Sequence, residues 1–274
     1  MKTMLEYTKK NSIVHNLTGA TKMLFLLAFV IASMISYDTR LLFGLLIFSI
    51  VIFKMSKVEF KEISFVFYFI MIFLVVNTII IFLISPYQGV EIYGTKTVLF
   101  KITNYYQVTV EQLFYQLNFV LKYLLITPMA LVFMVSTNPS EFASSLNKIG
   151  VSYKMSYAVA IALRYIPDVQ REYHDIAFAQ QARGIDMSKK TSIINRIKNA
   201  SIIIMPLIFS SLEKIEVISC AMEIRAFGTK KKRTWYSEQK TSKVDYLVRI
   251  IGIILIAISV YLIYRNGGRF YNPF

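Results

Sequence analysis

The chain has 274 residues, of which 55% are hydrophobic and only 17% are charged, and its mean hydropathy is +0.52. So much apolar surface excludes most soluble enzymes of this length and indicates an all-α integral membrane protein. The net charge of +15 would suit a nucleic-acid partner, but in a membrane protein it more often reflects basic residues on the cytoplasmic side, so we expect no nucleic-acid partner.

Five apolar runs follow in chain order, and a spanning helix needs about 20 mostly apolar residues. The first two, 23–37 and 41–53, are short. We interpret them as two tight spans, although a hairpin that does not fully cross is the alternative. The clear spans are 63–84, 113–136 and 246–264. The sequence therefore predicts about five transmembrane helices in three regions: residues 1–136 with four spans, 137–243, and 244–274 with the last span.

The basic residues set the orientation of these spans. Most of the 31 Lys and Arg residues fall before the first span, just after the second, or within 137–243. Because positive residues favour the cytoplasmic side, the pattern predicts a multi-pass cell-membrane protein with a cytoplasmic N-terminus and an outer C-terminus. The residues before the first clear span that carry this argument are Lys2, Lys9, Lys10, Lys22, Lys54, Lys57 and Lys61.

The outer loop 85–112 is rich in Thr, Tyr and Val, with turn residues between them. This composition predicts a small β-hairpin that pairs 97–102 with 107–110.

Region 137–243 has a different character from the spans. Asn138 followed by Pro139 predicts the start of a short amphipathic helix. Two long helices follow, at 152–184 and 192–228, and they share one plan: an apolar first part, an internal proline, a polar second part, then arginine and a glycine that stops the helix. Because each apolar part has only about ten residues, these amphipathic helices suit the membrane–cytoplasm boundary.

The two helix ends are the candidate functional site. Arginine near a helix C-terminus is favourable through the helix dipole, so ordinary capping is one explanation. An arginine at a helix tip with small neighbours can also enter a groove and bind a carboxylate in a fork geometry. Two such tips suggest two similar grooves on an ATPase dimer. The candidate docking residues are Ala182, Arg183, Gly184, Ile224, Arg225, Ala226 and Gly228.

Four stretches resemble the transmembrane scaffold (T) subunit of energy-coupling factor transporters, the EcfT family. They are "AQQARG" at 179–184, "AMEIRAFG" at 221–228, "TNPSEFASSLNKIGVSYKMSYAVAIALRYIP" at 137–167 and "VHNLTGATKMLFLL" at 14–27. The resemblance covers nearly the whole chain. The second arginine motif departs from the family pattern, because Ile224 and Ala226 replace the more usual Ala and Gly.

The resemblance implies a non-catalytic subunit that links two homologous cytoplasmic ABC ATPases, as a heterodimer, to a membrane-embedded substrate-binding S component. Arg183 and Arg225 would each dock into one ATPase, and the partner subunits would bind ATP, so the chain itself would need no cofactor. The long helices would act as coupling helices and place Met155, Val159 and Ile203 towards the S component. Pro167 and Pro206 would set the lever angle, or be simple kinks. The substrate would be a vitamin or a metal ion.

Two other functions remain as alternatives. The permease subunit of a conventional ABC transporter would bind substrate itself and should carry more polar residues within its spans. A membrane enzyme would need clustered carboxylates, histidines or a nucleophile near a span end, and the sequence shows none. His15 and His174 stand far apart without acidic or cysteine neighbours in a cluster, so no metal site is expected.

Overall fold

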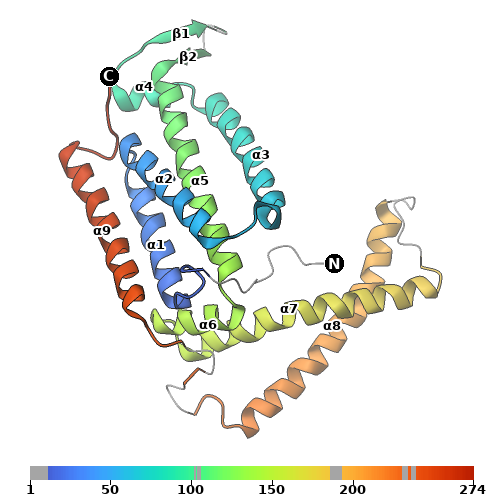
Figure 1. Cartoon of the computed structure of the whole chain (residues 1–274). Coiled ribbons are helices and arrows are strands. Elements are labelled where there is room, and N and C mark those ends of the chain that lie inside the picture. The colour runs from blue at the N-terminus through green and yellow to red at the C-terminus, as the bar shows by residue number, and fades with distance from the viewer. Residues whose placement is uncertain (1–11, 102, 104–105, 186–192, 230–233, 236–238) are drawn as a thin grey trace. The chain divides into compact units, whose positions relative to one another are not determined.

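The structure is a computed structural model of the whole chain, and it describes residues 12–101, 103, 106–185, 193–229, 234–235 and 239–274 (Figure 1). Lys2, Lys9, Lys10 and Ile102, used in the predictions above, lie outside these residues. The described part forms nine helices and one two-stranded sheet. The chain divides into two compact units, Met1–Glu141 with Gln239–Phe274, and Phe142–Glu238. The last span therefore belongs to the same unit as the first four.

The first unit is built from apolar helices. Four helices in the described part are long and apolar enough to cross a membrane. A fifth apolar helix, α1 (Gly19–Ile35), has 17 residues, the lower end of a spanning length. The prediction of an all-α membrane protein is confirmed. The first helix begins and ends earlier than the predicted run 23–37, and the second helix extends beyond both ends of the predicted run 41–53. The four longer helices are α2 (Thr39–Ser56), α3 (Phe60–Ile84), α5 (Val110–Ser136) and α9 (Lys243–Arg265).

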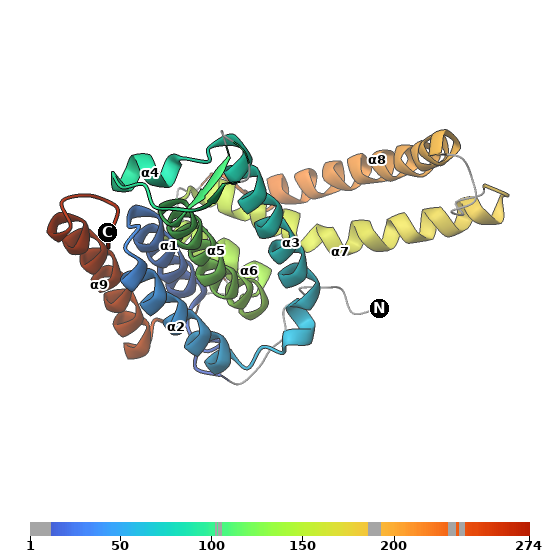
Figure 2. The same cartoon turned by 90° about the horizontal axis from the view of Figure 1, so that it is seen from above.

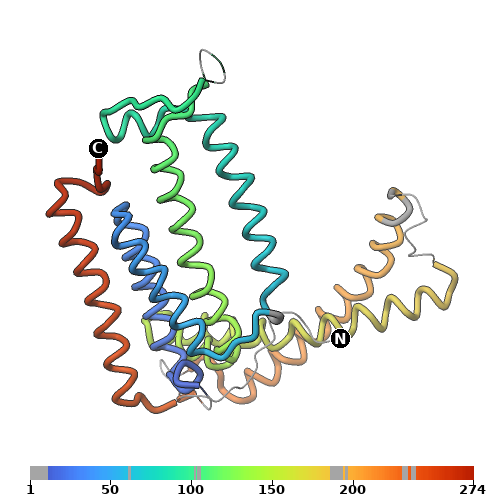
Figure 3. The backbone as a smooth tube through the Cα atoms, turned by 45° about the horizontal axis from the view of Figure 1, so that its top comes forward, coloured from blue at the N-terminus to red at the C-terminus, as the bar shows by residue number. Residues whose placement is uncertain are grey.

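Helices α1, α2 and α5 form the centre of this unit, with α9 along α1 and α3 beside α5 (Figures 1 and 3). Their core is a set of interlocking aromatic and aliphatic side chains: Phe25, Phe29, Leu42, Leu45, Leu121, Leu125 and Met129. On α9, Gly252 lies so close to Ala28 that a Cβ added there would sit 3.1 Å from the alanine side chain. Only 6% of the membrane-spanning part of α3 is buried within the protein, so most of its apolar surface faces outwards.

The loop between α3 and α5 contains the predicted hairpin. Strands β1 (Val98–Lys101) and β2 (Gln107–Thr109) pair antiparallel. The sequence did not predict α4 (Gln88–Tyr93), which precedes them and packs on α5. A Cβ at Gly89 would meet the backbone oxygen of Glu111 at 2.4 Å, so only glycine allows this close approach.

The C-terminal tail closes the same end of the first unit. The Tyr37 backbone N–H donates to the Arg269 carbonyl at 2.7 Å, and the Asn266 amide donates to the Asp38 carboxylate at 2.8 Å. Burial alone would raise the pKa of Asp38, but hydrogen bonds from the Asn266 amide and from the side chain and backbone of Arg40 outweigh it and lower this pKa. The tail is therefore held to the start of α2 by charged and backbone contacts.

The second unit contains most of α6 (Pro139–Lys148) and two long helices, α7 (Tyr153–Ala182) and α8 (Ile193–Ile224). The Asn138 carboxamide oxygen accepts from the Ser140 N–H at 3.0 Å, and the Ser152 hydroxyl accepts from the Met155 N–H at 3.3 Å. The predicted starts of α6 and α7 are thus confirmed, and both internal prolines lie inside continuous helices.

Candidate functional site

The end of α7 presents Arg183 through a specific arrangement of hydrogen bonds. Arg183 is the cap residue, and Gly184 follows with a φ of +89°. The Gly184 N–H donates to the Gln181 carbonyl at 2.9 Å, and the Ile185 N–H donates to the Gln180 carbonyl at 3.1 Å. This pair of bonds is a Schellman motif, in which a left-handed residue turns the chain away from the helix. The Arg183 side chain is therefore exposed at the tip of a terminated helix.

The end of α8 repeats this arrangement. Arg225 is again the first residue after the helix, and Ala226 follows with a φ of +52°. The Ala226 N–H donates to the Glu223 carbonyl at 2.8 Å, and the Phe227 N–H donates to the Met222 carbonyl at 2.9 Å. Both ends therefore place an exposed arginine at the same position of the same motif. Ala182 and Ile224, both exposed, occupy the last helical position of each.

The predicted stop at Gly228 is wrong. The helix ends at Ile224, and the residue equivalent to Gly184 is Ala226. Gly228 also has a positive φ, of +89°, but it lies in a further turn, where an added Cβ would sit 3.4 Å from the Lys154 side chain of α7. A non-glycine residue in the left-handed region costs about 1 kcal/mol, so packing beyond the helix must stabilise this end.

That packing is an aromatic cluster of Tyr153, Tyr157, Phe227 and Trp235. Phe227 lies 4.6 Å from Tyr157 and 5.5 Å from Tyr153, measured between ring centroids. Trp235 lies 5.6 Å from Tyr153, and its indole N–H donates to the Asn147 side chain at 3.2 Å. The cluster holds the end of α8 beside the start of α7.

Helices α7 and α8 cross each other (Figure 1), although they look nearly parallel in the view of Figure 2. Near their middle, the Lys214 ammonium donates to the Glu172 carboxylate at 2.6 Å, and the Ser210 hydroxyl donates to the same carboxylate. These hydrogen bonds, led by the one from Lys214, lower the pKa of Glu172. Arg225 thus lies at the start of α7 and Arg183 at its end, about 45 Å apart along a 30-residue helix.

The other predicted site residues lie along these helices. Met155 is 61% exposed and Val159 is partly exposed, as a partner-facing role requires. Ile203 is fully buried within the chain, so its surface is already occupied. The exposed apolar surface of α8 comes instead from its neighbours Ile202, Ile204, Met205, Ile208, Phe209, Leu212, Ile215 and Val217.

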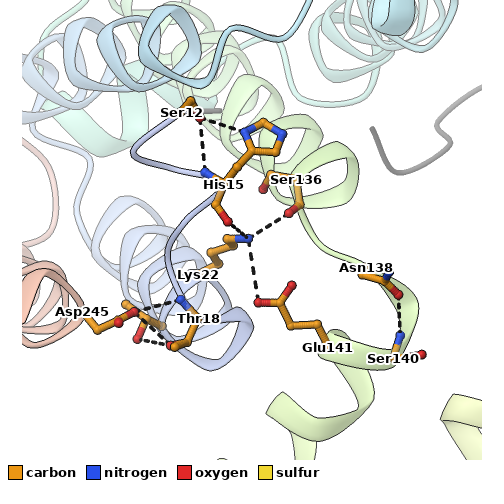
Figure 4. Close-up of polar contacts among 10 residues, drawn as sticks. Ser12, His15, Thr18, Lys22, Ser136, Asn138, Ser140, Glu141 and Asp245 are labelled. Carbon is orange, nitrogen blue, oxygen red and sulfur yellow. Dashed lines mark hydrogen bonds and ion pairs between the residues drawn. The ribbon is translucent and has the colours of Figure 1, made fainter. Parts of the chain in front are cut away.

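A buried polar cluster at one end of the first unit was not predicted as a site (Figure 4). The Lys22 ammonium donates to the carbonyls of His15 at 3.2 Å and Ser136 at 2.8 Å, and it lies 4.0 Å from the Glu141 carboxylate. It therefore joins the start of α1 to the end of α5 and the first turn of α6. The Asp245 carboxylate accepts from the backbone and hydroxyl of Thr18, both at 2.9 Å, and so joins α9 to α1.

Lys22 and Asp245 are each a charged residue at the edge of an apolar run, and this position is the sequence feature that could have indicated the buried cluster. Across the described residues, no three His, Cys, Asp or Glu side chains gather in a way that would hold a metal ion. The two exposed guanidinium groups have the donor geometry to bind a carboxylate.

The fold and the candidate site define a multi-pass helical membrane protein with two long helices that end in exposed arginines. The model of the CbiQ family, described as a cobalt transport protein, matches residues 10–236. The energy-coupling factor transporter transmembrane protein EcfT of Clostridium kluyveri is 28% identical over 273 residues, covering 94% of this chain and 95% of that protein. The same protein of Staphylococcus aureus is 28% identical, with 95% and 96% covered, and that of Bacillus subtilis is 25% identical, with 94% and 96% covered.

The chain belongs to this family of energy-coupling factor transporter transmembrane components. The resemblance inferred from the arginine motifs is thereby confirmed.

Proposed function

We propose that this chain is the energy-coupling scaffold of its transporter. It joins two cytoplasmic ATPase subunits to a membrane-embedded S component that binds the substrate, and it hydrolyses nothing itself. One observation carries the proposal: α7 and α8 end in the same Schellman motif, and each motif exposes an arginine at the cap position. A chain that only needed to stop two helices would not need the same cation at both tips.

Each arginine is suited to dock into an acidic groove. A guanidinium offers a rigid fork of donors that matches a carboxylate, and such charge-assisted pairs are among the stronger hydrogen bonds. The small residues Ala182, Gly184 and Ala226 next to the arginines let a partner approach the helix tip closely. Because about 45 Å of α7 separates the tips, they address two separate but homologous subunits, as in a heterodimer of ABC ATPases.

The helix pair would transmit motion between the ATPases and the membrane. The Glu172–Lys214 ion pair and the aromatic cluster join α7 and α8 at two places, so a displacement at one tip is passed to the other helix. Pro167 and Pro206 set the course of each helix near these joints.

The partner in the membrane would cover the apolar side chains that α7 and α8 expose. Exposed apolar patches of this extent mark interaction surfaces. Met155 and Val159 on α7 and Met205 and Phe209 on α8 belong to this surface. The S component would occupy it and would determine whether a vitamin or a metal ion is transported.

The basic residues support a cytoplasmic location for the N-terminus and the coupling helices. A permease that binds substrate itself is less well supported. The cavity of about 220 Å³ among the helices of the first unit has an almost entirely apolar lining, and Lys22 and Ser136 are the polar residues in it, whereas a site for a polar solute carries several convergent polar groups.

Reconstitution of the whole transporter in liposomes tests the proposal. Arg183→Ala and Arg225→Ala should each weaken ATP-driven uptake, and the double variant should lose most of the ATPases on purification. Loss of one charge-assisted pair costs roughly 1.5–3 kcal/mol, or about 10- to 100-fold in affinity for one subunit. Arg171→Ala is the matched control, because Arg171 is an exposed arginine within α7, away from its tip. Normal uptake by the double variant would refute the coupling role.

A further inference from the structure

The first unit contains two adjoining pockets that the proposed function does not use. The inner one is the apolar cavity of about 220 Å³, which lies between α1, α2 and α5, with Val248 and Ile251 of α9 on one side and Ile13, Val14 and Leu17 along its edge. Its lining includes Phe25, Leu26, Phe48, Ile52, Met129 and Val132.

Two polar residues, Lys22 and Ser136, line this cavity, and the Ser136 hydroxyl makes no hydrogen bond within the described part of the chain. The Lys22 ammonium lies at one end, but the carbonyls of His15 and Ser136 and the carboxylate of Glu141 surround it (Figure 4). The cavity therefore presents no available charge to a polar solute. Apolar cavities of this kind remain dry and accept hydrocarbon.

The second pocket is open and has a volume of about 430 Å³; three of its five lining residues are polar, although more of its lining surface is apolar than polar. Ser12, Asn16 and Lys57 line it, together with Ile13 and Met55. Ile13 and Met55 also line the inner cavity, so the two pockets adjoin at these apolar residues. A molecule with an apolar chain and a polar or anionic head matches the two linings.

The surroundings select the charge of that head. Lys57 lines the open pocket at the end of α2 and is exposed. Basic residues beside a membrane helix attract the anionic lipids of the cytoplasmic leaflet.

We propose that this double pocket binds an anionic phospholipid. One acyl chain lies in the apolar cavity between α1, α2 and α5, and the phosphate lies against Lys57, Ser12 and Asn16. A lipid held there would fill the cavity beside the Lys22 cluster, where α1, α5 and the start of α6 meet. The site is independent of ATPase docking, since none of its residues belongs to α7 or α8.

Native mass spectrometry of the full chain, purified in detergent, tests the site. The protein is titrated with phosphatidylglycerol and with phosphatidylcholine of the same acyl chains. We expect about fivefold tighter retention of phosphatidylglycerol, because one lysine near a membrane surface contributes about that factor. Lys57→Gln should remove this preference. Lys54→Gln is the matched control. It removes the same charge three residues before Lys57, and the Lys54 side chain lines neither pocket.

A second variant addresses the acyl chain. Ile52→Phe adds volume to the cavity from a partly exposed position, so it should lower the retention of both lipids while the melting temperature stays unchanged. Equal retention of the two lipids by the wild type would overturn the proposal. So would an equal effect of Lys54→Gln and Lys57→Gln, which would indicate general surface attraction, or full lipid retention by Ile52→Phe.

Discussion

Exchanging the two left-handed residues provides a direct test of the paired helix ends. Gly184 and Ala226 occupy the same position of the same motif, with φ values of +89° and +52°. Gly184→Ala should loosen the end of α7, whereas Ala226→Gly should tighten the end of α8. The two substitutions are chemically opposite, so their effects should have opposite signs.

The magnitude follows from the backbone. Alanine in the left-handed region costs about 1–2 kcal/mol relative to glycine. The greater freedom of glycine in the opened state offsets about 0.4–1 kcal/mol of this difference. A Cβ at Gly184 would meet nothing within 4 Å, so no steric clash adds to the cost there. The net effect is about 0.5–1 kcal/mol, or roughly a two- to fivefold change in local opening.

Hydrogen exchange of the full chain in detergent, followed by mass spectrometry, measures this opening. The informative amides are those of Gly184 and Ile185 at the first end, and of Ala226 and Phe227 at the second, because they make the bonds of the motif. Gly44→Ala, inside α2 with nothing near its added Cβ, is the control and should leave both ends unchanged. Slower exchange at the first end in Gly184→Ala would refute the assigned geometry.

Three further predictions concern the contacts that hold the elements in place. Glu172→Gln removes the ion pair with Lys214. Because folding lowers the pKa of Glu172, the ion pair stabilises the protein at neutral pH, and this stabilisation is lost as the pH falls through the pKa of the folded state. The melting temperatures of the wild type and the variant should therefore converge in acid. Lys22→Met leaves the Glu141 carboxylate buried without its cation and should destabilise the first unit by about 3 kcal/mol in thermal unfolding, with partial recovery on adding Glu141→Gln. Trp235→Ala should speed hydrogen exchange at the end of α8 but not at the end of α7, and Trp235→Phe should have a smaller effect.

The sequence was sufficient to predict those elements that are determined by residues close to them in the chain. The mostly apolar run of 22 residues at Ile63–Ile84 predicts its helix, because within a membrane a single segment satisfies its own backbone hydrogen bonds only as a helix. Ser152 and Gly184 predict the two ends of α7, because a hydroxyl cap and a left-handed glycine act on the nearest turn. The exposed arginine at the first tip follows directly from these local rules.

The sequence was insufficient where a distant contact decides. Alanine is the best helix former, so nothing local indicates that α8 ends at Ile224 with Ala226 as its left-handed residue, and the nearby Gly228 is the more obvious stop. The stop depends on the ring contacts of Phe227 with Tyr153 and Tyr157, about 70 residues away in the chain. Helix α4 was missed for the same reason: its six residues depend on the contact between Gly89 and the backbone of Glu111.

The two arginine-bearing helix ends are stabilised in different ways, and this affects how each would transmit a force. The Arg183 tip is determined by α7 alone, so a force on it is transmitted first along that helix. The Arg225 tip is determined by the aromatic cluster, which fastens it to the start of α7 through Tyr153 and Tyr157. A force on Arg225 therefore acts on both helices at once. Two ATPases that pull equally on the two arginines would displace the helix pair unequally, and a tilt of the pair rather than a simple translation is the motion that this geometry favours.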